Sequence, residues 1–218
     1  MSDTHTSQTV AMKKQEGQLG GMAHYYDMVM TLLTLGREKT LRDKTIELAH
    51  LNPGDKVLEI GCGTGTLTLE AKTKVGPTGE VTGIDIAPEM VAVATGKAAR
   101  KGINVTFREG NIAEIPFPDN SFDTVLCSFM IFHMPDYVRK KGLTEIFRVL
   151  KHGGHLFIID QALPDNKWQR TFVLNHLYWK HDVRELESEL KEYFFSEIEL
   201  GDAKFMGMWY IRGTANKT

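Results

Sequence analysis

Residues 57–65 read Val-Leu-Glu-Ile-Gly-Cys-Gly-Thr-Gly, an apolar run that leads into three glycines spaced two apart. The apolar run predicts a short buried strand over residues 56–60, and the glycines predict a turn whose backbone lies close to a ligand. Helical periodicity begins near Thr66. A strand, a glycine turn and a helix in this order are typical of the ligand-binding edge of an open α/β sheet.

Strands and helices alternate after this turn. Apolar segments predict strands at residues 80–85, 104–108, 124–129 and 155–160, and helical patterns begin near Pro88 and Asp136. Alternation of this kind indicates parallel strands joined by right-handed crossovers. The sequence therefore predicts an α/β fold with a doubly wound sheet.

The flanking segments complete a single domain over residues 21–218. Residues 1–20 are polar and predict a flexible tail, with a lid that orders over bound substrate as the alternative. Residues 21–51 have helical spacing interrupted at Gly36 and predict a helical cap before a core at 52–160. Residues 161–218 predict a long helix over about 166–193 and then a β-hairpin around Gly201-Asp202.

Composition narrows the classes of protein. The 218 residues carry a net charge of -2, which gives no overall electrostatic reason to bind nucleic acid. No segment is long and apolar enough to insert stably in a membrane, and the N-terminus lacks the apolar part of a signal peptide, so we expect a cytoplasmic protein. The two cysteines exclude a disulfide framework and a thiolate metal site.

The glycine spacing argues against a dinucleotide. The fingerprint G-x-G-x-x-G needs glycine at its sixth position, where this chain has Thr66. No Gly-Lys-Ser/Thr follows, so the turn is not a P-loop either. Tyr137 and Lys141 match the Tyr-x-x-x-Lys pattern of short-chain dehydrogenases, but that pattern is common by chance and follows the wrong glycine signature.

Two acidic residues near the turn indicate a ligand other than a dinucleotide. Glu59 lies two residues before the first glycine, where it would repel a phosphate and attract an ammonium group. Asp85 ends the next predicted strand, 20 residues after Gly65, and an acid there can accept both hydroxyls of a ribose. S-adenosylmethionine carries both a ribose and an amino group.

Four segments resemble, in order and spacing, the motifs of class I S-adenosylmethionine-dependent methyltransferases. They are VLEIGCGTG at 57–65, GIDIAPEM at 83–90, GNIAE at 110–114 with FPDNSFD at 117–123, and RVLKHGG at 148–154. The resemblance covers about residues 45–160. It implies a Rossmann-like, seven-stranded, mostly parallel sheet whose last strand is antiparallel, in agreement with the terminal hairpin. It also implies that S-adenosylmethionine is the cofactor and leaves as S-adenosylhomocysteine.

The same resemblance implies which residues contact the cofactor. They are Glu59, Gly61, Cys62, Gly63, Gly65, Asp85, Ile86, Asn111, Ile112 and Ser128. Glu59 would reach toward the methionine amino group and Asp85 would take the ribose hydroxyls. Ile86 would lie against the adenine, and Asn111 and Ile112 would frame it. The family more often has Asp at position 111; the Asn carbonyl can still accept the adenine amino proton, but Asn111 could instead be only a turn residue.

Within this superfamily the chain is similar to the ubiquinone/menaquinone-biosynthesis C-methyltransferases. The similarity lies in Tyr26-Asp27, in the Leu-Thr-Leu-Gly at 33–36 and in the 148–154 segment. The chain departs from that group upstream, where Met30, Glu38 and Leu41 replace Asn, His and Trp, and His152 replaces the usual Pro or Gln. We expect in-line methyl transfer to a small, apolar or aromatic acceptor. The alternatives are an N-methyltransferase of a lipid or small amine and a catalytically silent S-adenosylmethionine-binding protein.

Absent motifs exclude other acceptors. No Asp/Asn-Pro-Pro-aromatic follows the fourth predicted strand, which argues against methylation of nucleic-acid amino groups. Arsenic methylation needs more thiols than Cys62 and Cys127 supply. A divalent-metal O-methyltransferase would need carboxylates after the fourth and fifth strands, and Ser128 stands opposite Asp160, so no metal is expected.

Candidate catalytic residues lie on either side of the glycine turn. His133, just after the fourth predicted strand, is the candidate general base, with a packing role as the alternative. Tyr25 and Tyr26 lie on the cap, where the resemblance implies that they cover the acceptor, with core packing as the alternative for at least one of them. Apolar side chains could line an acceptor pocket or belong to the core; they are Met22, Met28, Met30, Phe129, Met130, Phe132, Trp168, Phe172 and Trp179. The sequence leaves a monomer and a homodimer equally open.

Overall fold

The computed structural model describes residues 25, 27–28, 31, 35–132, 134–168 and 181–217. Its strands are β1 Lys56–Ile60, β2 Glu80–Asp85, β3 Thr106–Glu109, β4 Phe122–Ser128, β5 Leu150–Gln161, β6 Phe195–Asp202 and β7 Met208–Ala215. Its helices are α3 Glu38–Leu48, α4 Thr66–Val75, α5 Pro88–Lys101, α6 Asp136–Val149, the 3-10 helix η1 Val183–Glu185 and α8 Leu186–Glu192. The predicted tail, Tyr26, His133 and residues 169–180 lie outside the described residues.

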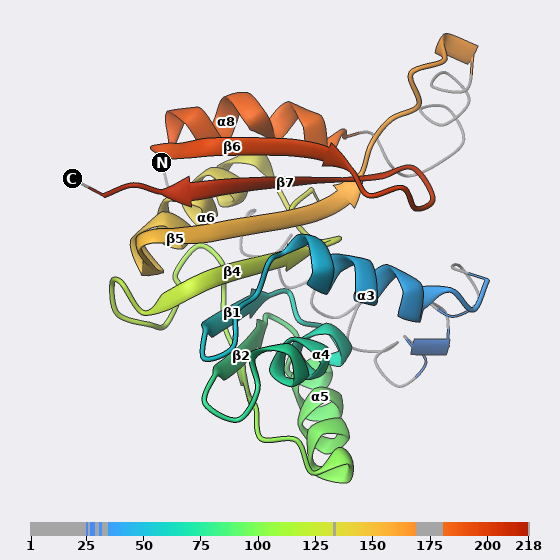
Figure 1. The fold of residues 1–218 in the computed structure, drawn as a ribbon, viewed down its shortest axis with the longest axis vertical. Coiled ribbons are helices and arrows are strands. Elements are labelled where there is room, and N and C mark those ends of the chain that lie inside the picture. Colours follow the sequence, from blue (N-terminus) through green and yellow to red (C-terminus); the bar gives the residue numbers. More distant parts are fainter. Residues whose placement is uncertain are drawn as a thin grey trace, which may run out of the picture.

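The seven strands form one sheet in the order β3-β2-β1-β4-β5-β7-β6 (Figure 1). Strands β1 to β5 pair in parallel, whereas β7 runs antiparallel to both β5 and β6. This confirms the predicted doubly wound, seven-stranded sheet with an antiparallel last strand. Strand order reverses between β1 and β4, and a ligand crevice lies at the carboxyl ends of the strands at such a point.

Helices cover both faces of the sheet (Figure 1). On one face, Leu58 and Ile158 belong to a buried cluster that includes side chains of α6 and α8. On the other face, Val57 and Phe157 pack with side chains of α3 and α4. Neighbouring residues of one strand thus enter different core layers, because side chains alternate across a strand. None of the described helices has the length and apolar character needed to cross a lipid bilayer.

The terminal hairpin is present, but its turn lies later than predicted. Gly201 and Asp202 still belong to β6, where they pair with Tyr210 and Trp209. The chain reverses just after them, where Ala203 N donates to the carbonyl of Met208. Gly207 in this segment has a φ of +72°, which glycine adopts without strain.

The predicted helix over 166–193 is not continuous. Residues 181 and 182 are non-helical, and the side chain of Asp182 accepts a hydrogen bond from Arg184 N. Asp182 therefore caps a new helical segment, η1, which runs on into α8. The apolar periodicity alone does not show this break, because a helix-capping acid leaves the spacing of apolar residues intact.

Candidate functional site

The glycine turn is fixed by backbone hydrogen bonds to the neighbouring strand. Gly61 N and Cys62 N both donate to the carbonyl of Ile84 at the end of β2, at 2.8 and 3.0 Å. Gly65 N donates to the carbonyl of Cys62 at 2.8 Å and stands just before the first residue of α4. The turn therefore places the backbone of the glycines at the carboxyl edge of the sheet, beside the N-terminus of α4.

Gly65 is required by both conformation and space. Its φ is +74°, and a Cβ atom placed there would lie 2.4 Å from Cζ of Phe107 and 2.8 Å from Cβ of Ala94. At Gly61, a Cβ atom would lie 2.9 Å from Cγ of Met130. The glycines therefore let β3, α5 and the segment after β4 close around the turn.

Asp85 ends β2 and braces the turn. Its Oδ2 accepts a hydrogen bond from Gly63 N at 2.8 Å, and its Oδ1 accepts one from Ala87 N at 2.9 Å. Burial raises the pKa of Asp85, against these backbone N–H groups, which lower it. Each carboxylate oxygen keeps a further lone pair, so the group is oriented and can still accept two hydroxyl donors. This geometry fits a ribose.

Glu59, on β1, is a buried acid with one hydroxyl partner. It is 3% exposed and accepts a short hydrogen bond from Oγ1 of Thr68 on α4. Burial raises the pKa of Glu59 to about 8, and the nearby charge of Asp85 adds to the effect. A cation beside such a group favours its ionised form. Glu59 therefore fits an ammonium group as its missing partner.

Asn111 and Ile112 lie in the loop after β3. Asn111 Oδ1 accepts a hydrogen bond from Ala113 N at 2.8 Å, so Asn111 does stabilise a turn, although that oxygen retains a lone pair. The side chain of Ile112 is buried against α6, where a Cβ atom at Gly142 would lie 2.7 Å from Ile112 Cγ1. The side chain of Ile112 thus belongs to the core and anchors the loop, and its expected place beside the adenine stays a prediction. Ile86 is half-buried just beyond Asp85.

A cavity of about 410 Å³ opens beside the glycine turn. This volume lies within the range of small-molecule sites. Helix α3 lines the cavity with Glu38, Leu41, Arg42 and Thr45. The sequence-predicted residues that also line it are Glu59, Gly61, Cys62, Gly63 and Ser128.

The other predicted residues lie outside this lining. Gly65, Asp85, Ile86, Asn111 and Ile112 lie along the adjoining ends of β1 to β3. Tyr25 lies in a turn and is 62% exposed, so the structure does not bring it to the cavity. Tyr26 and His133 lie outside the described residues, and their roles stay predictions.

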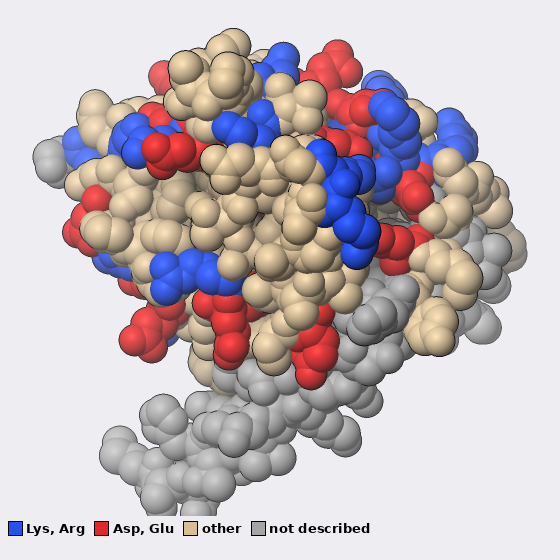
Figure 2. Space-filling view, turned by 90° about the horizontal axis from the view of Figure 1, so that it is seen from below, with Lys and Arg blue, Asp and Glu red and all other residues tan. Residues whose placement is uncertain are grey.

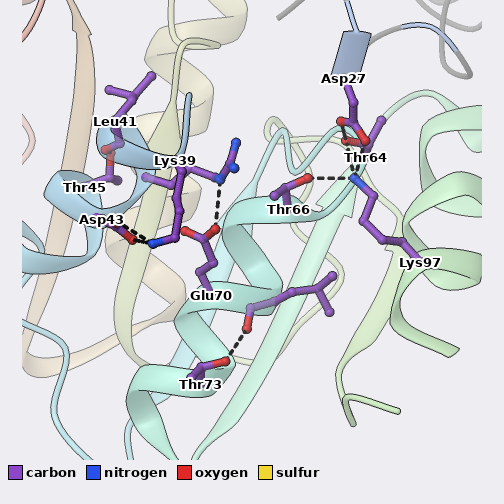
Figure 3. Close-up of polar contacts among 12 residues, drawn as sticks. Asp27, Lys39, Leu41, Asp43, Thr45, Thr64, Thr66, Glu70, Thr73 and Lys97 are labelled. Atoms are coloured by element: carbon purple, nitrogen blue, oxygen red, sulfur yellow. Dashed lines mark hydrogen bonds and ion pairs between the residues drawn. The ribbon is translucent and has the colours of Figure 1, made fainter. Parts of the chain in front are cut away.

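Lys97 of α5 ties the cap to the glycine turn, and sequence reasoning missed it. Its Nζ donates to Asp27 Oδ2 at 2.7 Å, to Thr66 Oγ1 at 2.7 Å and to Thr64 Oγ1 at 3.0 Å (Figure 3). Thr64 Oγ1 also donates to Asp27 Oδ1 at 2.6 Å. These partners are 31 to 70 positions from Lys97 in the chain, and Lys97 itself lies in none of the motifs.

Phe129 has an unusual backbone conformation that the sequence did not predict. It follows β4, lines the cavity and has a φ of +52°. A positive φ in a bulky residue is rare and is found preferentially at functional sites. The backbone is held there by a hydrogen bond from Phe129 N to the carbonyl of Ile159 at 3.1 Å.

Neither the two cysteines nor the described acidic and histidine side chains indicate a thiol nucleophile or a metal site. Cys62 and Cys127 are buried, and burial raises the pKa of both thiols, which keeps them protonated. Within the described ranges, no group of three or more His, Cys, Asp or Glu side chains is placed to hold a metal ion. The face shown in Figure 2 carries Lys and Arg intermixed with Asp and Glu.

The chain matches a known family over most of its length. Residues 51–205 match the family described as "Methyltransferase domain". A demethylmenaquinone methyltransferase of Listeria monocytogenes is 36% identical over 149 residues, 67% of this chain and 62% of that protein. A protein of the same name from Symbiobacterium thermophilum is 32% identical over 161 residues, 73% of this chain and again 62% of the relative. The match thus spans less than two thirds of these relatives.

The fold has counterparts among solved structures. A SAM-dependent methyltransferase from Aquifex aeolicus superposes with a TM-score of 0.64 at 25% identity. The superposition covers 80% of this chain and 89% of the Aquifex chain. The likeness therefore extends over most of both chains.

Proposed function

This chain belongs to the S-adenosylmethionine-dependent methyltransferases, and on that premise we propose that it methylates a small, apolar or aromatic acceptor. The observation that carries the cofactor part of the proposal is the pair of acids beside the glycine turn. Asp85 is oriented with open acceptor positions for two hydroxyls, and Glu59 is a buried acid suited to an ammonium group. A pyrophosphate would be repelled by the ionised carboxylate of Glu59.

The chain's own residues hold and align the reactants. The backbone of Gly61, Gly63 and Gly65 supports the cofactor, while Asp85 and Glu59 take its ribose hydroxyls and amino group. Ile86 and the Asn111 loop border the adenine. S-adenosylmethionine supplies a methyl group on a positively charged sulfur, which is already activated for transfer. The work left to the protein is in-line alignment and exclusion of water.

We infer a hydroquinone-type acceptor from the names of the relatives and from the apolar part of the cavity. Leu41 and Phe129 line it beside polar groups, a combination that suits an aromatic ring with hydroxyls. His133 is the candidate base for a carbon or phenol acceptor. An amine is the second candidate, because the carboxyl groups of Glu38 and Glu59 on the cavity wall would also favour an ammonium group.

Calorimetry with S-adenosylmethionine and S-adenosylhomocysteine tests the cofactor assignment. We expect both to bind, and absence of binding of either ligand at high micromolar concentration would refute it. Methyl incorporation into a panel of quinols, phenols and amines then tests the acceptor. Normal cofactor binding without turnover on any acceptor would indicate a catalytically silent binding protein instead.

A further inference from the structure

Glu38, the first residue of α3, lines the cavity and has a carboxylate oxygen without a hydrogen-bond partner. This oxygen, Oε2, is shielded from solvent, so a small rotation of the side chain would be needed to bring it to a ligand in the cavity. In the described part of the chain, two further carboxylates have such an oxygen, Glu70 and Asp160. Neither of these lines the cavity, so Glu38 alone combines both properties.

None of the cations that line the cavity pairs with Glu38, whether Arg42, Lys97, Arg100 or Lys101, and the first two are engaged elsewhere. Arg42 Nε donates to Glu70 Oε1 at 2.9 Å, and Lys97 is held by Asp27. Among the described residues Glu38 itself makes no ion pair within 4.0 Å. A buried carboxylate oxygen without a donor is unfavourable, and this cost opposes the favourable effect of an acid in the first turn of a helix. A donor brought by a ligand would supply the missing partner.

We propose that the carboxylate of Glu38 accepts a hydrogen bond from the polar group of the methyl acceptor, an O–H or an ammonium N–H, and thereby determines which methyl acceptors the cavity holds. The proposal rests on the proposed function and names the recognition element for the acceptor. An ionised carboxylate accepts hydrogen bonds and donates none. A methyl-acceptor molecule in which a methyl group replaces the hydrogen of its O–H or N–H would therefore lose the hydrogen bond to Glu38.

The first test needs no ligand and compares Glu38→Met with Glu47→Met on the same helix. Glu47 is exposed and serves as the matched control. If Glu38 serves a ligand, Glu38→Met removes an unpartnered buried oxygen and raises the melting temperature by about 2 °C or more, while Glu47→Met changes it little. An acid in a first helical turn favours the helix, so a Glu38 with a structural role gives the opposite sign. A fall in melting temperature larger than that of Glu47→Met would overturn the proposal.

The second test measures acceptor binding to the protein saturated with S-adenosylhomocysteine. The probes are 1,4-naphthohydroquinone, kept under nitrogen, its dimethyl ether 1,4-dimethoxynaphthalene, and 1-naphthylmethylammonium. We expect Glu38→Met to weaken binding of a donor probe about tenfold or more and to leave binding of the dimethyl ether unchanged. Weakening confined to the hydroquinone identifies a hydroxyl, and weakening confined to the ammonium identifies an amine.

Equal binding of donor and ether probes to the unmodified protein, or equal effects of the substitution on both, would overturn the proposal. Affinity for S-adenosylhomocysteine is a separate readout. It should be the same in Glu38→Met, Glu47→Met and the unmodified protein. Failure of the unmodified protein to bind it would refute the proposed function, whereas the melting comparison would still decide the role of Glu38.

Discussion

Replacing Gly65 by Ala measures how tightly the glycine turn is enclosed. An L-residue at a φ of +74° costs about 1–2 kcal/mol. The new methyl group would also lie 2.4 and 2.7 Å from two ring carbons of Phe107 and 2.8 Å from Cβ of Ala94. Overpacking of this kind adds about 1–3 kcal/mol. We therefore expect Gly65→Ala to lower the free energy of unfolding by about 2–5 kcal/mol.

Gly102→Ala is the matched control, because Gly102 has a φ of +62° and nothing lies within 4 Å of its added Cβ. It should cost only the conformational part, about 1–2 kcal/mol. Urea denaturation of both variants, with linear extrapolation to water, separates the two effects. Equal losses of stability would refute the conclusion that Phe107 and Ala94 close around the turn. Adding Phe107→Leu to Gly65→Ala should recover part of the loss, which a double-mutant cycle detects.

Three further predictions concern the site. Asp85→Asn should weaken binding of S-adenosylmethionine about tenfold or more while circular dichroism shows an intact fold, and unchanged affinity would contradict the ribose assignment. Affinity for S-adenosylmethionine should rise as pH increases toward 8, because the pKa of Glu59 is about 8 and the carboxyl must lose its proton before it can pair with an ammonium group. In calorimetry, Glu59→Gln should abolish this dependence of affinity on pH. Without ligand, Glu59 keeps its proton in the folded state up to a pH of about 8, whereas in the unfolded state its pKa is near 4.5. The free energy of unfolding should therefore fall as pH rises from 4.5 to about 8. This fall should be smaller in Glu59→Gln.

Features that depend on local sequence could be predicted. The carboxyl ends of parallel strands meet at one edge of a sheet. Glu59 near the end of β1 and Asp85 at the end of β2 could therefore be placed together from the order of the strands alone. Alternating apolar segments likewise predicted the sheet, and Pro88 and Asp136 begin α5 and α6 as expected. These assignments need only the period of the pattern and the rule for crossovers.

Features that depend on distant contacts could not be predicted. Ile112 follows the predicted strand end, but only its packing against Gly142 on α6 shows that its side chain belongs to the core. Lys97 lies on an ordinary helical face, and its hydrogen bond to Asp27 joins residues 70 positions apart. The acceptor oxygen of Glu38 is unpartnered because of what surrounds it, which no pattern of residue types records.

The position of β7 has a consequence for the assembly of the protein during synthesis. It comes last of the seven strands along the chain but lies inside the sheet, between β5 and β6. A nascent chain that has not reached Met208 therefore leaves one edge of β5 open and β6 without its partner strand. Open edges of this kind favour pairing with other chains. Completion of the sheet thus depends on a late-synthesised strand, and the interval before it emerges is when the growing chain most needs protection from aggregation.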